Sequence, residues 1–271
     1  MEKITFRPFE DREAYTDGYL HDPITEMTEH RERFPAVVVC PGGGYEFLSQ
    51  READPVALQY FAAGYNVFIL YYSISENAKN FGPLKELSET VCKIRENADA
   101  WRVDPEQIAV CGFSAGGHLA ASLGTLWNNE TFLRQYDNRG GLNRPNAMLL
   151  CYPVITADPR LAHAGSIETV SGSPLGSPGA DFFSLEKQVT ADTAPAFLWH
   201  TVEDDAVPIE NSLRMVSALQ AQKIPFECHF FPTGGHGLSV CTQEVGNPDA
   251  YNARWMDMSI RWLDKLFAYH L

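Results

Sequence analysis

Short apolar runs alternate with longer segments of helical periodicity along most of this chain, and that alternation restricts its fold more than any other feature. The runs occupy residues 36–40, 66–72, 107–111, 147–151, 196–200 and 226–231. Continuous apolar runs are typical of strands buried on both faces, and helices between them supply the crossovers of a parallel sheet. The sequence therefore predicts the α/β class.

The two ends of the chain extend this pattern. Residues 4–9 and 15–20 predict two antiparallel edge strands, which bring the expected sheet to eight strands. Residues 250–270 predict a closing amphipathic helix, because large apolar side chains recur there at helical spacing. That stripe consists of Trp255, Met258, Trp262 and Leu266. We therefore expect a mostly parallel eight-stranded sheet with helices on both faces.

The chain is expected to form one domain with an insert. Its 271 residues fit a single α/β domain, and no internal repeat or low-complexity tract divides it. Residues 152–195 differ in composition, because they gather prolines and glycines and show few helix signals. Loops of this length are commonly functional. We expect one domain over residues 1–271 and a loop-rich, lid-like insert at about 152–195.

Charge and hydropathy limit the classes of partner. The net charge is −14, which repels nucleic acid phosphates and anionic membrane surfaces. Residues 55–75 carry no charge and approach the roughly 20 residues of a membrane span. Helical spacing before Gly64 and a β-branched, aromatic run after it favour a helix, a turn and a buried strand. We expect neither nucleic acid nor membrane partners, while a homo-oligomer remains open.

The six cysteines show no CxxC spacing, which argues against zinc and redox motifs. Cys40, Cys111 and Cys151 each end an apolar run, so reduced and buried thiols are expected. We predict no metal and no cofactor. Charged residues occupy the N-terminal positions where a secretory signal needs an apolar core, and a cytoplasmic location is expected.

A Gly-x-Ser-x-Gly pattern centred on Ser114 gives the most specific chemical signal. It follows the run at 107–111 and opens a helical segment. In that context the pattern is typical of a nucleophile elbow, where Gly112 and Gly116 avoid clashes in a sharp turn between strand and helix. We expect Ser114 to be the nucleophile.

A serine nucleophile needs a base and a carboxylate that orients it. His236 is the best placed of eight histidines, because it lies in the glycine-rich loop that follows the last predicted strand. The acidic residues 203–205 follow the run at 196–200. Three adjacent carboxylates cannot all reach one imidazole, so this position alone leaves the choice between them open.

The glycines at 42–44 follow the first buried run and predict an oxyanion hole. They free the backbone N–H groups of Gly43 and Gly44 to approach a ligand, and the N–H of Ala115 lies next to the nucleophile. A phosphate-binding loop is the rival interpretation. The spacing fits neither GxGxxG nor GK[ST], and Glu46 and Glu52 follow, which makes an anion site unfavourable.

Together these segments resemble the α/β-hydrolase superfamily, and more closely its bacterial acetyl esterases and acetylxylan-esterase-like carboxylesterases related to the hormone-sensitive lipase group. The resemblance runs from about residue 36 to the C-terminus. The residues that carry it are 40–45, 64–68, 103–105, 112–118, 200–208 and 234–238. One departure is that the HGGG stretch of lipase-like relatives begins with Pro41 here, so the imidazole that would brace the loop is missing.

The resemblance implies a serine carboxylesterase with the triad Ser114, Asp204 and His236. Asp204 is preferred because residues 200–208 match the family's motif, and Asp205 is the alternative. The implied substrate is a small ester or an acetylated oligosaccharide. Tyr45 and Trp199 are the aromatic residues best placed by sequence to stack on a sugar, and packing in the core is the equal alternative for Trp199. A small-peptide hydrolase and a non-catalytic ligand-binding homologue are the competing hypotheses.

Overall fold

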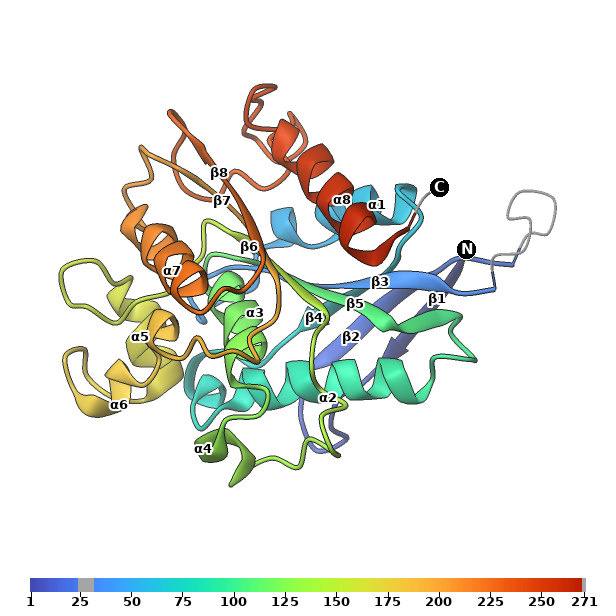
Figure 1. Cartoon of the computed structure of the whole chain (residues 1–271), viewed down its shortest axis with the longest axis horizontal. Coiled ribbons are helices and arrows are strands. Elements are labelled where there is room, and N and C mark those ends of the chain that lie inside the picture. The colour runs from blue at the N-terminus through green and yellow to red at the C-terminus, as the bar shows by residue number, and fades with distance from the viewer. Residues whose placement is uncertain (24–31, 270–271) are drawn as a thin grey trace.

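An eight-stranded sheet runs through the centre of the protein in a computed structural model that describes residues 1–23 and 32–269 (Figure 1). The strand order is β1-β2-β4-β3-β5-β6-β7-β8. The strands are β1 (Glu2–Phe6), β2 (Tyr15–Leu20), β3 (Phe34–Cys40), β4 (Asn66–Tyr71), β5 (Val103–Phe113), β6 (Ala147–Cys151), β7 (Ala196–Thr201) and β8 (Phe226–Phe231).

The sheet is parallel from β4 to β8 and antiparallel at one edge. β3 pairs in parallel with β4 and β5, and the parallel pairing continues through β6, β7 and β8. β1 and β2 form an antiparallel pair, and β2 joins the sheet antiparallel to β4. The predicted mostly parallel eight-stranded sheet is confirmed. β5 begins four residues before the predicted run at 107–111, because Val103 also pairs with Phe34.

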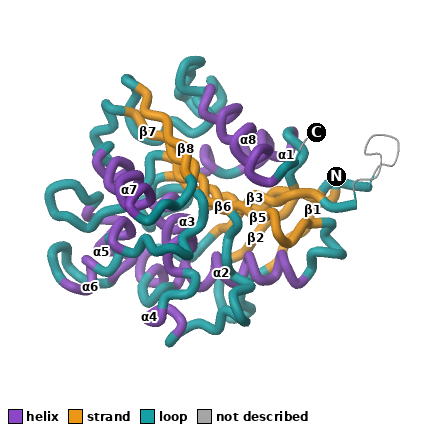
Figure 2. The backbone as a smooth tube through the Cα atoms, viewed as in Figure 1, coloured by secondary structure: helices purple, strands orange, loops and turns teal. Residues whose placement is uncertain are grey.

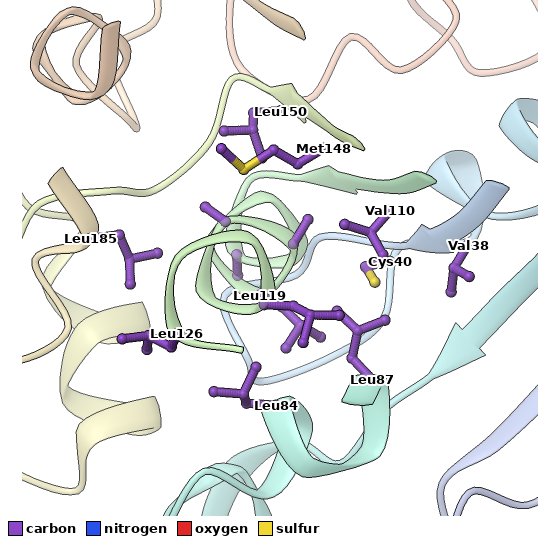
Figure 3. Close-up of a cluster of buried hydrophobic side chains, with 14 of the residues drawn as sticks. Val38, Cys40, Leu84, Leu87, Val110, Leu119, Leu126, Met148, Leu150 and Leu185 are labelled. Carbon is purple, nitrogen blue, oxygen red and sulfur yellow. The ribbon is translucent and has the colours of Figure 1, made fainter. Parts of the chain in front are cut away.

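Helices cover both faces of the sheet, as the tube view in Figure 2 also shows. α1 (Asp54–Ala62) and α8 (Arg254–Phe267) pack on one face. α2 (Gly82–Glu96), α3 (Ala115–Leu126) and α7 (Glu210–Ala221) pack on the other. Alternate residues of each central strand contribute to the two cores, so Val38 and Val110 meet Leu87 and Leu119 on the α2 and α3 side (Figure 3).

The closing helix is shorter than predicted, and its buried stripe is shifted. α8 spans Arg254–Phe267, and His270 lies outside the described residues. Trp255 is buried as expected, but Leu266 is 38% exposed, while Leu263 and Phe267 face the core. The predicted stripe followed a nearly exact four-residue spacing. A helix turns every 3.6 residues, so such a stripe drifts away from the core.

The uncharged segment at 55–75 is confirmed as a helix, a turn and a buried strand. α1 ends before Gly64, whose φ is 88°, and β4 follows directly. A helix able to span a bilayer is absent from the part of the chain that the structure describes.

The predicted insert at 152–195 contains three short helices rather than an unbroken loop. They are α5 (Ala164–Ser171), α6 (Pro178–Asp181) and the 3-10 turn η3 (Leu185–Lys187). Asn211 of α7 accepts hydrogen bonds from the N–H of Ile155 and Thr156, which attaches the start of the insert to the sheet's helical layer. The single-domain assignment and the lid remain predictions. The remaining short helices are α4 (Glu130–Leu133), η1 (Gln50–Glu52) and η2 (Ser75–Ala78).

Three free thiols lie on the neighbouring strands β3, β5 and β6. Cys40, Cys111 and Cys151 are fully buried, and burial raises the pKa of Cys40 and Cys151. Cys111 and Cys151 point to the α1 and α8 side, whereas Cys40 faces the opposite core. Because side chains alternate along a strand, neighbouring strands need not present their last residues on the same face.

Candidate active site

Ser114 occupies a sharp turn between the end of β5 and the start of α3. Its φ of 54° and ψ of −118° are unfavourable for a residue with a side chain. Two glycines make the turn possible, because a Cβ on Gly112 would lie 2.0 Å from the carbonyl oxygen of Gly116. A Cβ on Gly116 would lie 2.1 Å from the carbonyl oxygen of Cys40. This is the geometry expected of a nucleophile elbow.

Ser114, His236 and Asp204 form a continuous chain of hydrogen bonds. The Ser114 hydroxyl donates to Nε2 of His236 over 2.8 Å, and Nδ1–H of His236 donates to Oδ2 of Asp204 over 2.6 Å. The three residues follow β5, β8 and β7 respectively, so the carboxyl edge of the parallel strands brings them together. A base oriented in this way can accept the serine proton during nucleophilic attack.

The carboxylate of Asp204 is fully enclosed by hydrogen-bond donors. Its oxygens also accept hydrogen bonds from Nε2–H of His200 over 3.2 Å and from the N–H of Val207 over 2.9 Å. Burial alone would raise the pKa of Asp204, but the donors from His200, His236 and Val207 hold it well below its usual range. Asp204 therefore remains an ionised acceptor for His236.

The neighbouring acids occupy different positions. Asp205 is exposed and makes no hydrogen bond among the described residues. Glu203 accepts a hydrogen bond from the N–H of Gly234 over 3.1 Å, which supports the start of the loop that carries His236. Of the three carboxylates, the structure brings only Asp204 to the imidazole.

The glycine turn after β3 lies beside Ser114. Gly43 and Gly44 adopt φ values of 127° and 67°, and both residues line the cavity that contains Ser114. Within the described residues, the N–H groups of Gly43, Gly44 and Ala115 have no hydrogen-bond acceptor. Free donors beside a nucleophile suit an oxyanion. We therefore retain these three amides as the proposed oxyanion donors.

Two known protein families match different segments of the chain. The BD-FAE family matches residues 24–149, and the prolyl oligopeptidase family matches residues 180–269. The first match includes Ser114 and the glycine turn, while the second includes Asp204 and His236.

A similar solved structure covers nearly the whole chain. It is MGS-M1, an α/β hydrolase enzyme from a Medee basin deep-sea metagenome library. It is 34% identical to this chain with a TM-score of 0.80, over 99% of this chain and 98% of that one. This chain belongs to the α/β-hydrolase family.

Two further relatives of this chain are informative. The acetyl ester-xyloside bifunctional hydrolase of Caldicellulosiruptor lactoaceticus is 29% identical with a TM-score of 0.82, over 98% of this chain and 97% of that one. Endo-1,4-beta-xylanase B of Butyrivibrio fibrisolvens is 37% identical over 84% of this chain. This chain spans only 36% of that xylanase's length.

A buried carboxylate that no local sequence pattern marks as a structural support braces the glycine turn. Glu52, in η1, is 3% exposed, and its Oε2 accepts a hydrogen bond from the N–H of Gly42 over 2.8 Å. Its Oε1 accepts from the Tyr152 hydroxyl over 2.7 Å, and that hydroxyl accepts from the N–H of Ser239 over 2.9 Å. Glu52 thus links the glycine turn to the loop that follows His236.

The glycine turn lacks the imidazole of the HGGG stretch, and a tyrosine hydroxyl supports it as well. The Tyr72 hydroxyl donates to the carbonyl oxygen of Pro41 over 2.5 Å, which supports the same turn from the β4 side. Glu52 lies in a polar stretch, and Tyr72 ends an apolar run. Neither local pattern indicates a brace, because the contact depends on distant segments meeting.

Replacing Glu52 with glutamine tests this brace. The glutamine amide has one carbonyl acceptor for two donors, Gly42 N–H and Tyr152 O–H, so one buried donor loses its partner. We expect the free energy of unfolding to fall by about 1–3 kcal/mol. We also expect kcat to fall by about tenfold as the turn loosens. Urea unfolding and ester kinetics check both effects, with exposed Glu10→Gln as the control. A variant indistinguishable from that control would contradict the brace.

The structure does not support the expected stacking role of Tyr45 and Trp199. Tyr45 is 1% exposed, and its hydroxyl donates to Nδ1 of His118 over 3.0 Å. Trp199 is fully buried, with its ring stacked on Trp255 at 5.1 Å between centroids. A ring enclosed on both faces cannot receive a sugar, so neither residue is retained as a substrate contact.

His118 is a buried residue of the core, and its protonation is linked to the stability of the fold. Burial lowers its pKa to about 4, although the hydrogen bond from Nε2–H to the carbonyl oxygen of Phe183 opposes the shift. In the unfolded chain this imidazole titrates near pH ~6.5. Below that pH the unfolded state binds a proton that the folded state does not bind until about pH 4. The free energy of unfolding is therefore highest above pH ~6.5 and decreases as the pH falls toward 4. At pH 5, His118 is expected to reduce the free energy of unfolding by about 2 kcal/mol.

This linkage is measurable with His118→Gln, which keeps a donor and an acceptor at the site. Urea unfolding at pH 7.5 and pH 5.0 should show a loss on acidification that is about 2 kcal/mol smaller in the variant than in the native chain. Equal losses in the two proteins would show that His118 does not carry the effect.

The cavity beside Ser114, here called the Ser114 pocket, has a volume of about 300 Å³. His163 and Gly165 of the insert form one wall, and Phe47 and Arg51 line it from the segment after the glycine turn. Glu46 accepts a hydrogen bond from Thr169 of α5 over 2.9 Å, which connects the two walls. Within residues 1–23 and 32–269, no cluster of three His, Cys, Asp or Glu side chains is placed to bind a metal.

Proposed function

We propose that this chain is a serine carboxylesterase that hydrolyses short-chain acyl esters, in particular acetyl groups on xylan-type saccharides. The hydrogen-bonded series Ser114, His236 and Asp204 is the observation that carries the proposal, because it opens into the Ser114 pocket beside free amide donors. The fold alone supports many chemistries, so the activity is argued from this site.

In the proposed reaction, Ser114 Oγ attacks the ester carbonyl carbon while its proton moves to Nε2 of His236. The carbonyl oxygen becomes an oxyanion that accepts hydrogen bonds from the N–H groups of Gly43, Gly44 and Ala115. His236 then gives its proton to the departing alcohol. A water molecule repeats the sequence on the acyl-enzyme and releases the carboxylic acid. Asp204 keeps the imidazole oriented and stabilises its protonated form.

The saccharide part of the proposal is supported by the relatives rather than by the triad. One similar structure is named as an acetyl ester-xyloside bifunctional hydrolase, and one curated relative is named as a xylanase. Acetyl esters on xylose units are the chemistry that such neighbours suggest for this pocket.

The size of the Ser114 pocket predicts a preference for short acyl groups. A volume of about 300 Å³ leaves little room for both an alcohol and a long chain. An extended chain would lie outside and lose roughly 0.8 kcal/mol of burial for each CH₂ that stays in water. We expect acetate and propionate esters to exceed octanoate in kcat/KM when a series of ethyl esters is assayed. A kcat/KM that rises steadily to octanoate would contradict this prediction.

The competing peptidase hypothesis has one supporting observation, the match of residues 180–269 to the prolyl oligopeptidase family. A panel of acetylated xylo-oligosaccharides, simple acetate esters and aminoacyl anilides separates the two. The proposed function requires acetate release to exceed anilide cleavage. Faster anilide cleavage would favour the peptidase, and absence of turnover on every substrate would favour a non-catalytic homologue.

A further inference from the structure

Phe47 is an exposed aromatic residue beside the proposed oxyanion donors. Its side chain is part of the Ser114 pocket, yet the residue is 62% exposed. The ring lies directly against the glycine turn, since a Cβ placed on Gly43 would be 3.1 Å from Cδ2 of Phe47. The ring therefore lines the Ser114 pocket and has a face open to a ligand that enters it.

His163 of the insert also lies near this turn and lines the same pocket. A Cβ placed on Gly44 would be 3.8 Å from Cε1 of His163. Nδ1 of this imidazole accepts the N–H of Ser166 over 3.3 Å and thereby caps α5. Burial, together with the nearby His236, lowers the pKa of His163. Because Nδ1 accepts the N–H of Ser166, the neutral ring carries its proton on Nε2, and this donor has no acceptor among the described residues.

We propose that Phe47 and His163 form a saccharide subsite for the alcohol part of the ester. The Phe47 ring stacks on the C–H face of a pyranose, and Nε2–H of His163 donates to a sugar oxygen. This inference rests on the proposed function, because it places the acetyl carbonyl at Gly43 and Gly44. The sugar attached to that acetyl group then lies between the two flanking side chains.

The exposure of Phe47 favours a sugar over an acyl tail. A stacked pyranose covers one face of the ring and leaves its own hydroxyls in water, which suits an open rim. An acyl chain gains binding energy only where a groove encloses it. The single donor of His163 complements a ligand whose edges carry oxygen atoms. A flat apolar group and a polar donor that line one pocket therefore suit an amphipathic ring.

The test compares methyl 2-O-acetyl-β-D-xylopyranoside with ethyl acetate, which has the same acyl group but no sugar. Phe47→Ala should lower kcat/KM for the xyloside about tenfold, with a clearly smaller loss for ethyl acetate. Phe47→Trp should restore most of the xyloside activity because it keeps a flat ring. His163→Asn retains the cap of α5 but removes the Nε2 donor, and should lower kcat/KM for the xyloside about fivefold.

Tyr15→Ala is the matched control, because Tyr15 is an exposed aromatic residue on strand β2 that does not line the Ser114 pocket. It should leave the ratio of the two kcat/KM values unchanged. The subsite is wrong if Phe47→Ala leaves the xyloside unaffected, or if it lowers both esters by the same factor.

A binding measurement distinguishes failure of the subsite from failure of the proposed function. Xylobiose is titrated by saturation-transfer NMR into Ser114→Ala protein, with and without Phe47→Ala. We expect the second substitution to weaken binding about tenfold. If the native chain hydrolyses neither ester but this dependence on Phe47 holds, the esterase proposal fails and the subsite is supported. If xylobiose does not bind, or binds both proteins equally, the subsite is refuted.

Discussion

Replacing Ser114 with alanine is expected to lower kcat for acetate esters by at least about 1,000-fold, because only the oxyanion donors and substrate binding then remain to promote attack by water. The side chain is small and 8% exposed, so the fold should survive its loss. Steady-state acetate release with the native chain and the variant measures the effect.

Covalent labelling provides an independent check of the same assignment. An organophosphonate should inactivate the native chain and add its mass to the peptide that contains Ser114, while leaving Ser114→Ala unmodified. A variant that keeps a tenth of the native activity, or an adduct on another peptide, would refute Ser114 as the nucleophile.

The second large effect concerns the two adjacent aspartates. Asp204→Asn should lower kcat by about 1,000-fold or more, because an amide can turn its NH₂ toward His236 and hold the imidazole in the wrong tautomer. The exposed neighbour provides a matched control of identical chemistry. Asp205→Asn should remain within about twofold of the native kcat, as surface substitutions away from a site usually have small effects.

Kinetics of both variants on one acetate ester decide this prediction. Comparable losses would mean that Asp205 also supports the imidazole, and a larger loss in Asp205→Asn would reverse the assignment. Because donors hold the pKa of Asp204 well below its usual range, this carboxylate should not itself protonate in mildly acidic assays. Any decline of activity in that range must have another source.

The sheet and the turn at Ser114 were predictable because their signals are local. Continuous apolar runs such as 36–40 indicate strands buried on both faces, and the structure contains each of them. The glycines at 112 and 116 are required by close backbone contacts within a few residues of Ser114 and at the adjacent strand. Patterns of this kind carry their physical cause within a short stretch of sequence.

The aromatic residues of the site were not predictable in the same way. Tyr45 and Phe47 are two residues apart in the sequence, yet one is enclosed by His118 and Tyr72 and the other is exposed to water. The two residues share the same sequence neighbours, so local composition does not distinguish them. Which ring faces the pocket depends on the path of the glycine turn and on side chains from distant helices, which no local period encodes.

The role of Glu52 was likewise not predictable from local sequence. A glutamate in a polar stretch usually lies at the surface. Glu52 is buried and supports the turn only because folding brings Gly42, Tyr152 and Ser239 into one hydrogen-bonded network with it. Sequence reasoning treated this residue as an obstacle to anion binding at the glycine turn. The structure instead uses its carboxylate to hold the turn.

The buried thiols of β3, β5 and β6 give the protein an internal reporter of opening. Cys40, Cys111 and Cys151 have no exposed surface, and a thiol reagent can reach them only when the central strands separate. The rate at which these cysteines become labelled therefore measures opening of the sheet independently of ester turnover. A substituted chain that is inactive yet labels as slowly as the native one has lost its chemistry and kept its fold.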